Sequence, residues 1–348
     1  MSHRIGCVGY ATEQGLGHLM RDFYRNGVVT DVIIFRHPHG DRSRPTHAEW
    51  YPPGTPVVTR PFVGEAFERF LDDLHAVLFF ETPFDWDYVR RCRERGVRTV
   101  LVPMYEWHLQ NPPQRFDAYV NPSLLDQRYF PHGTFLPVPV NPASWAGRTR
   151  ALRFLHNAGH VGSRNHKGTE EVLRAFPLLT RPVQLTVRCQ DAPLLLKLHQ
   201  QAFGDEPVAD RVNRAGASIR LETGSRPYET LFDGHDVFVM AEKFNGLSLP
   251  LQEARAAGMA VVTTNRFPMN TWLNPDHLIP VREYRRAQCM RGHLEFDEAV
   301  VSPSDVAATL DRLYDQDLTQ DSNAALAWAN DNSWGALKDR WVRAVLGV

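Results

Sequence analysis

The sequence predicts an α/β protein made of two Rossmann-like, doubly wound domains. Its 348 residues are more than one ordinary hydrophobic core supports. Short apolar runs alternate with helical patterns through both halves, which is typical of parallel sheets covered by helices on both faces. A proline-rich segment, Pro137 to Gly147, interrupts the alternation and marks a linker. We therefore expect a first domain over residues 1–145 and a second over residues 146–330.

In the first half, short apolar runs typical of strands are separated by amphipathic patterns typical of helices. Glycine after such a pattern, as in Asn26-Gly27 and at Gly96, is a common helix end. The expected strands are Arg4–Tyr10, Asp31–Phe35, Ala76–Glu81, Arg98–Pro103, Ala118–Asn121 and Thr134–Val138. The expected helices are Leu19–Arg25, Gly64–Leu71 and Asp85–Arg95.

A second alternating series follows the linker. Its expected strands are Leu152–Asn157, Gln184–Arg188, Ser218–Leu221, Val237–Met240 and Ala260–Thr264. Its expected helices are Thr169–Phe176, Leu194–Ala202 and Pro227–Phe232. The tail after Pro303 reads as helical, with a break over Asp317–Ser322 and a last helix over Trp334–Val345.

Composition excludes several classes of protein. The formal net charge is −1, so no global field attracts the chain to nucleic acid or membranes. The 4 cysteines are widely spaced, which favours free thiols in a reducing compartment. No apolar run reaches the roughly 20 residues that span a bilayer, and the N-terminus enters a strand directly. We expect a cytoplasmic protein without a membrane partner. Sequence motifs of serine hydrolases, P-loop ATPases and zinc proteases are absent.

The segment Asp236–Asn265 is the most specific in the chain. It reads as a buried strand, a loop rich in Gly, Ser and Asn, an amphipathic helix and a second strand. Such a loop lies at the carboxyl edge of a parallel sheet, where ligands bind. The order from Gly246 to Ala254, followed by Gly258, closely resembles the donor-sugar loop of GT-B glycosyltransferases. The closest resemblance is to the large retaining family whose signature is Glu, seven residues, Glu.

The resemblance implies roles for this loop. Glu253 takes the second acidic position and would accept hydrogen bonds from the ribose of a nucleotide. Backbone N–H groups of Gly246, Leu247 and Ser248 would hold hydroxyls of the sugar. Asn245 stands where the family has its first Glu; it can bond a sugar hydroxyl but supplies no negative charge, for which Glu242 could compensate. The alternative for Glu253 is an exposed residue in the first helical turn, stabilised by the helix dipole.

Two further loops match the family in order. Gly15 and Gly17 lie between the first strand and the first helix, where the absence of Cβ atoms lets backbone N–H groups approach a phosphate; an ordinary tight turn is the alternative. In the family, a Lys-Gly step precedes a helix at this place, and Lys167, before helix Thr169–Phe176, matches its Lys. Arg164, or His160 in its place, would be the second cation. Together they would stabilise the leaving diphosphate without a metal; the alternative is a solvated helix N-terminus.

The end of strand Arg98–Pro103 carries polar and aromatic residues. Glu106 could orient or deprotonate an acceptor hydroxyl, and Tyr105 and Trp107 could stack on a sugar or base. A core-edge aromatic cluster with a solvated Glu is the alternative. Asp85-Trp86-Asp87 has the form of a metal-binding DxD, but it opens a helix, where Asp85 is an ordinary N-cap.

The resemblance as a whole implies a GT-B fold, with two Rossmann-like domains facing across a cleft, and a last helix, residues 331–348, packing back on the first domain. It is closest in character to compact bacteriophage-type glycosyltransferases, as in Gln14-Gly15-Leu16-Gly17 and Asn270-Thr271-Trp272-Leu273. The implied activity is metal-independent hexosyl or pentosyl transfer from a nucleotide sugar, with UDP favoured, and no cofactor.

The acceptor is open. Some phage enzymes of this kind decorate hydroxymethylated bases in DNA, and two basic segments, Arg36–Arg44 and Arg90–Arg98, are compatible with DNA as a partner. The second segment also fits a solvated helix face. A glycan, a protein or a small molecule are alternative acceptors. A non-catalytic module that binds nucleotide sugars, favoured by Asn245, and a nucleotide-sugar epimerase are alternatives to transfer.

Overall fold

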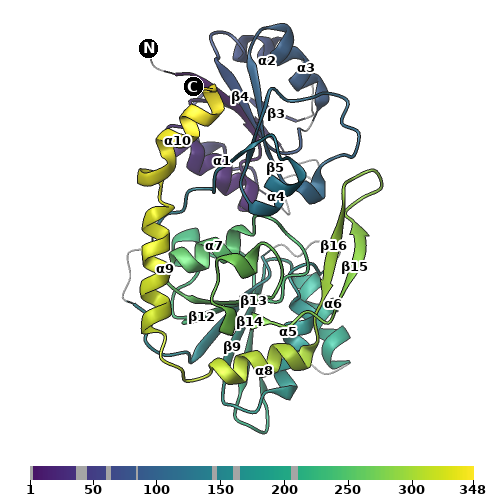
Figure 1. The fold of residues 1–348 in the computed structure, drawn as a ribbon, viewed down its shortest axis with the longest axis vertical. Helices are drawn as coiled ribbons and strands as arrows, with labels where there is room; N and C mark the ends of the chain where they lie inside the picture. Colours follow the sequence, from purple (N-terminus) through teal and green to yellow (C-terminus); the bar gives the residue numbers. More distant parts are fainter. Residues whose placement is uncertain are drawn as a thin grey trace. The chain divides into compact units, whose positions relative to one another are not determined.

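The computed structural model describes residues 3–36, 45–59, 64–83, 85–142, 147–159, 165–204 and 211–348. The chain forms two compact units (Figure 1). Unit 1 comprises Met1–Pro139, Gln288–Glu295 and Trp334–Val348, and unit 2 comprises Val140–Ala287 and Phe296–Ser333. The boundary falls inside the proline-rich segment, a few residues earlier than expected. Residues 288–295 belong to unit 1, although the sequence pattern assigned them to the second domain.

Unit 1 is built on a parallel sheet with the strand order β3-β2-β1-β4-β5-β6-β7. Buried, largely apolar runs explain its central strands, since both faces are covered. The strands are β1 (Ile5–Gly9), β2 (Asp31–Phe35), β3 (Val57–Val58), β4 (Ala76–Glu81), β5 (Arg98–Pro103), β6 (Ala118–Asn121) and β7 (Thr134–Phe135). The order reverses between β1 and β4, which makes the carboxyl ends of these two strands the topological switch point of the sheet.

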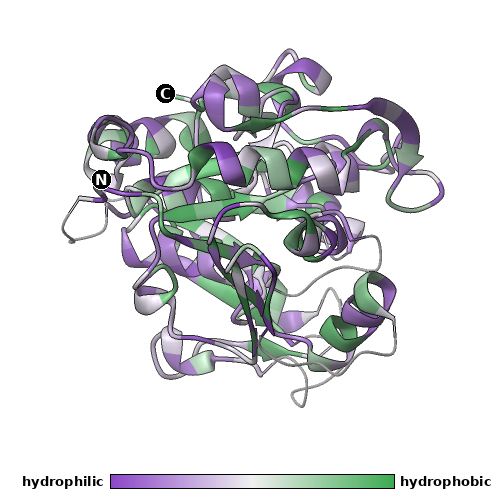
Figure 2. Cartoon of the chain, turned by 90° about the horizontal axis from the view of Figure 1, so that it is seen from below, coloured by the Kyte–Doolittle hydropathy of each residue, from purple (hydrophilic) through white to green (hydrophobic). Residues whose placement is uncertain are grey.

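Helices cover both faces of this sheet. Apolar residues of α2 (Glu65–Phe70) and α3 (Trp86–Glu94) pack in one core cluster with the strands. On the other face, Phe23 of α1 (Gly15–Arg25) contacts Phe80 of β4. In Figure 2 the strands are mainly green and the helices carry both green and purple residues, as amphipathic helices on a buried sheet should.

The C-terminal helix α10 (Trp334–Leu346) is part of unit 1. Its Trp341 is fully buried and packs edge-on against Phe23, with ring centroids 4.8 Å apart. The Trp341 indole N–H donates to the carbonyl of Pro137 at 3.0 Å. The apolar residues that the sequence assigned to this contact, namely Trp334, Leu337, Trp341 and Val345, are all buried.

Unit 2 repeats the plan, with the strand order β10-β11-β9-β8-β12-β13-β14. Its described pairings are parallel except for the antiparallel pair of β10 and β11. The strands are β8 (Arg153–Asn157), β9 (Gln184–Cys189), β10 (Arg211–Val212), β11 (Ser218–Thr223), β12 (Val237–Met240), β13 (Ala260–Thr264) and β14 (Leu278–Ile279). The order reverses between β8 and β12, so the switch point lies at their carboxyl ends.

The helices of unit 2 again form two layers. One face of its sheet packs against α5 (Thr169–Ala175), α6 (Ala192–Phe203) and α8 (Pro303–Leu313). The other packs against α7 (Leu249–Ala256), which in turn contacts α9 (Thr319–Asp331). The predicted class of an α/β protein with two doubly wound, parallel-sheet domains is confirmed.

Some local predictions were wrong. The expected helix Pro227–Phe232 is only one 3₁₀ turn, η4 (Tyr228–Thr230), and the expected break over Asp317–Ser322 already contains the start of α9. The helix α4 (Leu124–Tyr129) and the two-stranded sheet of β15 (Glu283–Gln288) and β16 (Glu295–Val300) were not foreseen. Within the described part of the chain, no helix is long and apolar enough to cross a membrane.

Candidate functional site

Two loops meet at the switch point of unit 2, one after β8 and the other after β12. The backbone N–H of Lys243 donates to the carbonyl of His166 at 2.7 Å. Gly168 has a φ of +68°, and a Cβ there would lie 2.1 Å from the carbonyl oxygen of Ala241. Only glycine therefore fits, and its absence of a side chain lets the start of α5 approach the end of β12. An ion pair of 2.8 Å between Lys243 and Glu171 strengthens the junction.

Lys167 belongs to the first of these loops. Its Nζ donates to the carbonyl of Ala158 at 2.7 Å, and a Cβ on Gly159 would come within 3.1 Å of the same Nζ. Burial lowers the pKa of Lys167, while the carboxylates of Glu242 and Glu253 oppose that shift. The ammonium group thus lies within electrostatic reach of both carboxylates, and the structure brings together residues that are far apart in the sequence.

Asn245 shapes the second loop. Its Oδ1 accepts the backbone N–H groups of Leu247 at 3.0 Å and of Ser248 at 2.9 Å, which closes an Asx turn ahead of α7. Two of the N–H donors expected to hold a sugar therefore already bond this side chain in the structure. Gly246 and Leu247 are buried, and Ser248 adopts a left-handed conformation with a φ of +46°.

Glu242 is the buried acidic residue of the same loop. Its carboxylate accepts from the Ser248 hydroxyl at 3.0 Å and lies 3.4 Å from the guanidinium of Arg266. Arg266 also donates to the carbonyls of Asn245 at 2.5 Å and Phe267 at 3.1 Å. Burial raises the pKa of Glu242, and Arg266 and Ser248 counteract the shift. Arg266 was not foreseen as a site residue, because it follows a different strand, β13.

Glu253 is held by a second residue that the sequence analysis did not single out. The hydroxyl of Tyr228 in η4 donates to its carboxylate at 2.9 Å. Glu253 lies in the second turn of α7, since that helix starts at Leu249, and it is half-buried. The alternative of an exposed residue in the first helical turn is therefore wrong. Arg164 and His160, the two candidates for a second cation, lie outside the described residues.

In unit 1, the loop after β1 packs against its own helix. A Cβ on Gly17 would lie 2.1 Å from the carbonyl oxygen of Thr12, so this glycine is required for that contact. Gly15 is exposed at the first position of α1. His18 lies 3.0 Å from the carboxylate of Glu13 and stacks on Trp50 at 5.5 Å. Burial, together with nearby cations, lowers the pKa of His18 to about 3, so the imidazole is neutral at physiological pH.

The predicted acceptor-side residues follow β5 in the 3₁₀ turn η2 (Tyr105–Trp107). Glu106 is 4% exposed, which contradicts the alternative of a solvated Glu. Tyr105 is buried and stacks on Tyr129, with ring centroids 4.8 Å apart, so it is not available to stack on a ligand as predicted. Trp107 is 37% exposed and remains a candidate for stacking.

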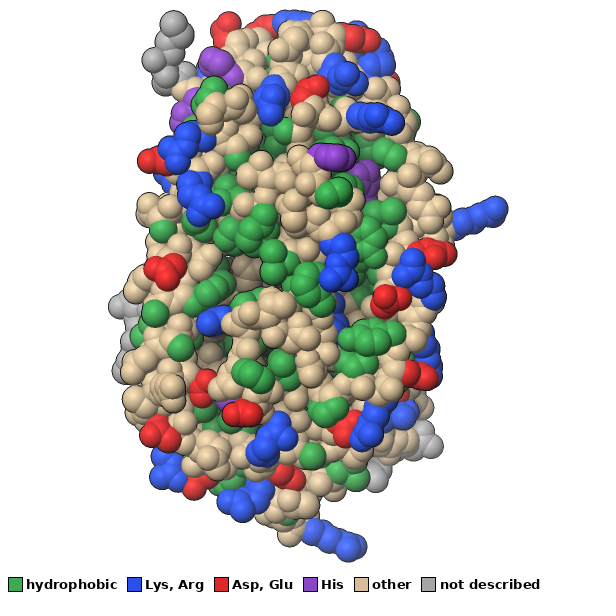
Figure 3. Space-filling view, in the orientation of Figure 1, with side chains coloured by type: hydrophobic (Ala, Val, Ile, Leu, Met, Phe, Trp, Pro, Cys, Tyr) green, Lys and Arg blue, Asp and Glu red, His purple; other side chains and the backbone are tan. Residues whose placement is uncertain are grey.

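Four of the five arginines in the second basic segment pair with neighbouring acids. Arg90, Arg91, Arg93 and Arg95 pair with Asp87, Glu94, Glu68, Asp117 and Asp72. On the molecular face shown in Figure 3, blue and red side chains are interspersed in the same way. The first segment lies largely outside the described residues. Asp85 accepts the backbone N–H of Asp87 at 2.9 Å, which confirms it as the N-cap of α3.

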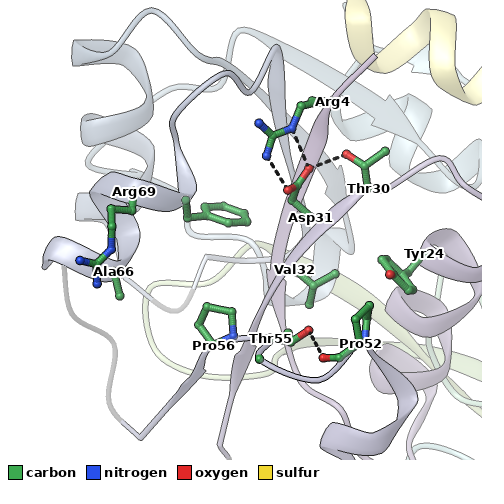
Figure 4. Close-up of a pocket in the computed structure, with 12 residues that line it drawn as sticks. Arg4, Tyr24, Thr30, Asp31, Val32, Pro52, Thr55, Pro56, Ala66 and Arg69 are labelled. Atoms are coloured by element: carbon green, nitrogen blue, oxygen red, sulfur yellow. Dashed lines mark hydrogen bonds and ion pairs between the residues drawn. The ribbon is translucent and has the colours of Figure 1, made fainter. Parts of the chain in front are cut away.

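A surface cavity of about 420 Å³ lies elsewhere in unit 1 (Figure 4). It is lined by residues such as Arg4, Asp31 and Arg69, and Asp31 begins β2, so the cavity lies at the amino edge of the sheet. Its cations are already paired: Arg4 with Asp31 at 2.6 Å and Arg69 with Glu65 at 2.7 Å. The cavity therefore lies away from the carboxyl-edge residues and offers no free charge.

The sequence matches no protein-family model and no curated protein. Solved structures are nevertheless similar over the whole chain. HepE of Anabaena, in complex with UDP and glucose, has a TM-score of 0.64 at 8% identity, covering 99% of this chain and 100% of that one. A glycosyltransferase from Rickettsia africae has a TM-score of 0.64 at 11% identity, covering 99% of both chains.

AviGT4, a glycosyltransferase involved in avilamycin A biosynthesis, has a TM-score of 0.53 at 14% identity, again covering 99% of both chains. These neighbours share the GT-B architecture, in which two doubly wound domains follow each other along the chain. The protein therefore has the GT-B fold. At such low sequence identity, the similarity to these structures shows the fold alone.

Proposed function

We propose that the protein is a glycosyltransferase that moves a sugar from a nucleotide-sugar donor to an acceptor hydroxyl. The observation that carries this proposal is the junction of the two switch-point loops in unit 2. It gathers one ammonium group, Lys167, with two carboxylates, Glu242 and Glu253, at the edge of the sheet where ligands bind in doubly wound domains. A cation is suited to a diphosphate, and a carboxylate is suited to ribose hydroxyls.

Each group has a role in the proposed reaction. Lys167 stabilises the negative charge that grows on the departing diphosphate, with Arg164 or His160 as the second cation and no metal. Glu253, oriented by the Tyr228 hydroxyl, accepts hydrogen bonds from the ribose. The loop from Asn245 to Ser248 holds the sugar, and Glu242 supplies the negative charge that Asn245 lacks. Retention of the anomeric configuration follows from the resemblance to the Glu-seven-Glu family.

UDP is the favoured nucleotide of the donor. One of the similar structures, Anabaena HepE, was solved in complex with UDP and glucose. We expect UDP and a UDP-sugar to raise the melting temperature of the protein in a panel of nucleoside diphosphates and UDP-sugars. A ligand at about 100 times its dissociation constant adds about 2.7 kcal/mol to the free energy of unfolding. The stabilisation should be insensitive to EDTA and should be smaller in Lys167→Ala.

The UDP-sugars that stabilise the protein can then be used to distinguish a transferase from a protein that only binds them. Asn245 uses its side-chain oxygen within its own loop, which favours the second candidate function, a nucleotide-sugar-binding module without transfer. Release of UDP from a stabilising UDP-sugar, abolished by Lys167→Ala, would exclude that module. If no nucleotide stabilises the protein, the proposed donor site is wrong.

Duplex DNA with hydroxymethylated bases is the acceptor suggested by the phage-type resemblance. The paired arginines of Arg90–Arg98 weaken this suggestion, which then depends on the segment Arg36–Arg44. We expect binding to duplex DNA in low salt to fall steeply as salt is added, because phosphate contacts release counterions. Undetectable binding at low salt would redirect the search to glycans, proteins and small molecules.

A further inference from the structure

His156 is a buried polar residue at the switch point of unit 2. It belongs to β8 and is 0% exposed. Phe154 of β8 and Ala158 just after it belong to the hydrophobic core that packs against α5. Because side chains alternate along a strand, His156 lies on the same face of the sheet as these two residues. An imidazole at this place needs hydrogen bonds, since burying its polar atoms without partners is costly.

Both ring nitrogens of His156 have a partner. The Nδ1 lies 2.8 Å from the carbonyl oxygen of Val239 in β12, and the Nε2 lies 2.9 Å from the hydroxyl of Thr169 at the start of α5. A carbonyl only accepts, so the Nδ1 carries the proton and the Nε2 accepts from the Thr169 hydroxyl. The two bonds thus fix one neutral tautomer of the ring. Burial lowers the pKa of His156 to about 4, with the bond to Val239 opposing the shift and Lys167 adding to it.

The bond to Val239 spans the two central strands of unit 2. The described pairing of β8 with β12 ends at Leu155 and Phe238, and the His156 side chain contacts the next carbonyl of β12. At this point the strand order reverses and the crevice of a doubly wound sheet opens. His156 therefore extends the contact between the two strands below the candidate site.

Each partner of His156 precedes or follows a charged residue of that site. Lys167 lies two residues before Thr169, and Glu242 lies three residues after Val239. The planar imidazole is thus a short, rigid link between the segment that carries the ammonium group and the segment that carries the buried carboxylate. Loss of either hydrogen bond would let the two segments move relative to each other.

We propose that His156 is a positioning residue of the donor site and sets the separation between Lys167 and Glu242. It acts through its hydrogen bonds to Thr169 and Val239 rather than on the donor itself. This inference rests on the proposed glycosyltransferase function, in which the ammonium group acts on the diphosphate and the carboxylate on the sugar. Both groups must be in place at the same time, and a misplacement of about 1 Å can cost about 10²-fold in rate.

The alternative is that His156 only stabilises the core of unit 2. A buried histidine with both nitrogens bonded can do so without any effect on a reaction. The two roles differ in what the loss of one hydrogen bond changes. A core contact changes the melting temperature, whereas a positioning contact also lowers the rate at saturating donor while the affinity for the nucleotide is kept.

The test uses the full chain and UDP release from UDP-glucose, UDP-galactose or UDP-N-acetylglucosamine, whichever stabilises the wild type, with water as the acceptor. Thr169→Val removes the hydroxyl and keeps the shape of the side chain, so it should lower kcat about tenfold. Its affinity for UDP, measured by calorimetry, should stay within about twofold of the wild type, because the charges that bind the nucleotide are retained. Thr169→Ser keeps the hydroxyl and should have a kcat within about twofold of the wild type.

Thr186→Val is the matched control, because it removes the same kind of hydrogen bond elsewhere in unit 2. The Nδ1 of His235 lies 2.8 Å from the carbonyl oxygen of Asp233, and its Nε2 lies 3.1 Å from the Thr186 hydroxyl. Thr186→Val should lower the melting temperature and leave kcat unchanged. His156→Phe loses both bonds of the proposed link and should lower kcat about 10²-fold. If His156→Phe does not fold, the comparison of Thr169→Val with Thr169→Ser still decides.

The imidazole can also be followed without the reaction, by nuclear magnetic resonance of protein labelled with isotopic nitrogen in histidine. The signals of His156 are those that are absent from His156→Phe or that shift in Thr169→Val. They should report the Nδ1–H tautomer and should not titrate between pH 6 and pH 8, because burial keeps the ring neutral. An Nε2–H tautomer, or a change of charge within this range, would contradict the proposed link.

The outcomes separate this inference from the function on which it depends. If the wild type neither binds nor hydrolyses a UDP-sugar, the proposed function fails. If the wild type is active and Thr169→Val keeps the kcat of Thr169→Ser, His156 only stabilises the core. The same conclusion follows if Thr186→Val loses as much rate as Thr169→Val. A UDP affinity of Thr169→Val that falls in step with kcat would also overturn the inference, because the hydroxyl would then support nucleotide binding rather than the geometry of the reaction.

Discussion

Replacing Lys167 with alanine is expected to lower the rate of sugar transfer by about 10²–10³-fold, the effect of removing one preorganised electrostatic group. The Nζ is fixed by the carbonyl of Ala158 and lies in a tight space beside Gly159. Its charge is therefore positioned before the donor binds, and little reorganisation is needed as the diphosphate departs. The rate of UDP-sugar turnover, measured at saturating donor, checks the prediction.

Matched variants separate the charge of Lys167 from its bulk. Lys167→Met keeps the length of the side chain and removes the ammonium group, so it should behave like Lys167→Ala. Lys197→Ala removes an exposed lysine from α6 of the same unit and should have no effect. If Lys167→Ala lost less than tenfold in rate, the diphosphate would bind elsewhere and the assignment of this loop would be wrong.

The central strands could be predicted from the sequence because their signal is local. Asp31–Phe35, Ala76–Glu81 and Val237–Met240 each contain a continuous apolar run, and the structure gives them the predicted bounds. The sheet of β15 and β16 was missed because β15, Glu283–Gln288, is polar and largely exposed. Without an apolar period, the sequence offers no sign that a segment is a strand.

The residues of the candidate site also differ in whether a local sequence signal identifies them. Lys167, Asn245 and Glu253 could be selected because a loop, a helix and a strand follow one another along the chain in a recognisable order. Arg266 and Tyr228 could not, because each reaches the site from another segment and is identified only by its distance to Glu242 or Glu253. His156 lies in a predicted strand, but its hydrogen bonds to Val239 and Thr169 are visible only in the structure.

Removing Arg266 is expected to cost about 3–5 kcal/mol in the free energy of unfolding, the usual effect of leaving one member of a buried ion pair uncompensated. Arg266 is 3% exposed and Glu242 is 1% exposed. Burial already raises the pKa of Glu242, with Arg266 opposing the shift. In Arg266→Ala the pKa should rise further. The deficit should then be larger at pH 8 than at pH 5, because the raised pKa favours the protonated carboxyl in the folded state and this advantage is lost as pH rises above the ordinary pKa of the unfolded chain. Denaturant unfolding at both values measures it.

A double variant distinguishes two effects of Arg266, the neutralisation of Glu242 and the support of the loop that precedes α7. Arg266→Met with Glu242→Gln leaves no buried charge, and such replacements are often close to neutral in stability. Most of the deficit should therefore be recovered. The hydrogen bonds from Arg266 to the carbonyls of Asn245 and Phe267 are still missing in this variant, so the loop that precedes α7 loses its support. Affinity for the UDP-sugar should consequently stay reduced although the protein is stable. If the double variant recovered its full affinity for the UDP-sugar, Arg266 would only balance the charge of Glu242. If Arg266→Ala cost less than about 1 kcal/mol in the free energy of unfolding, water would already solvate Glu242.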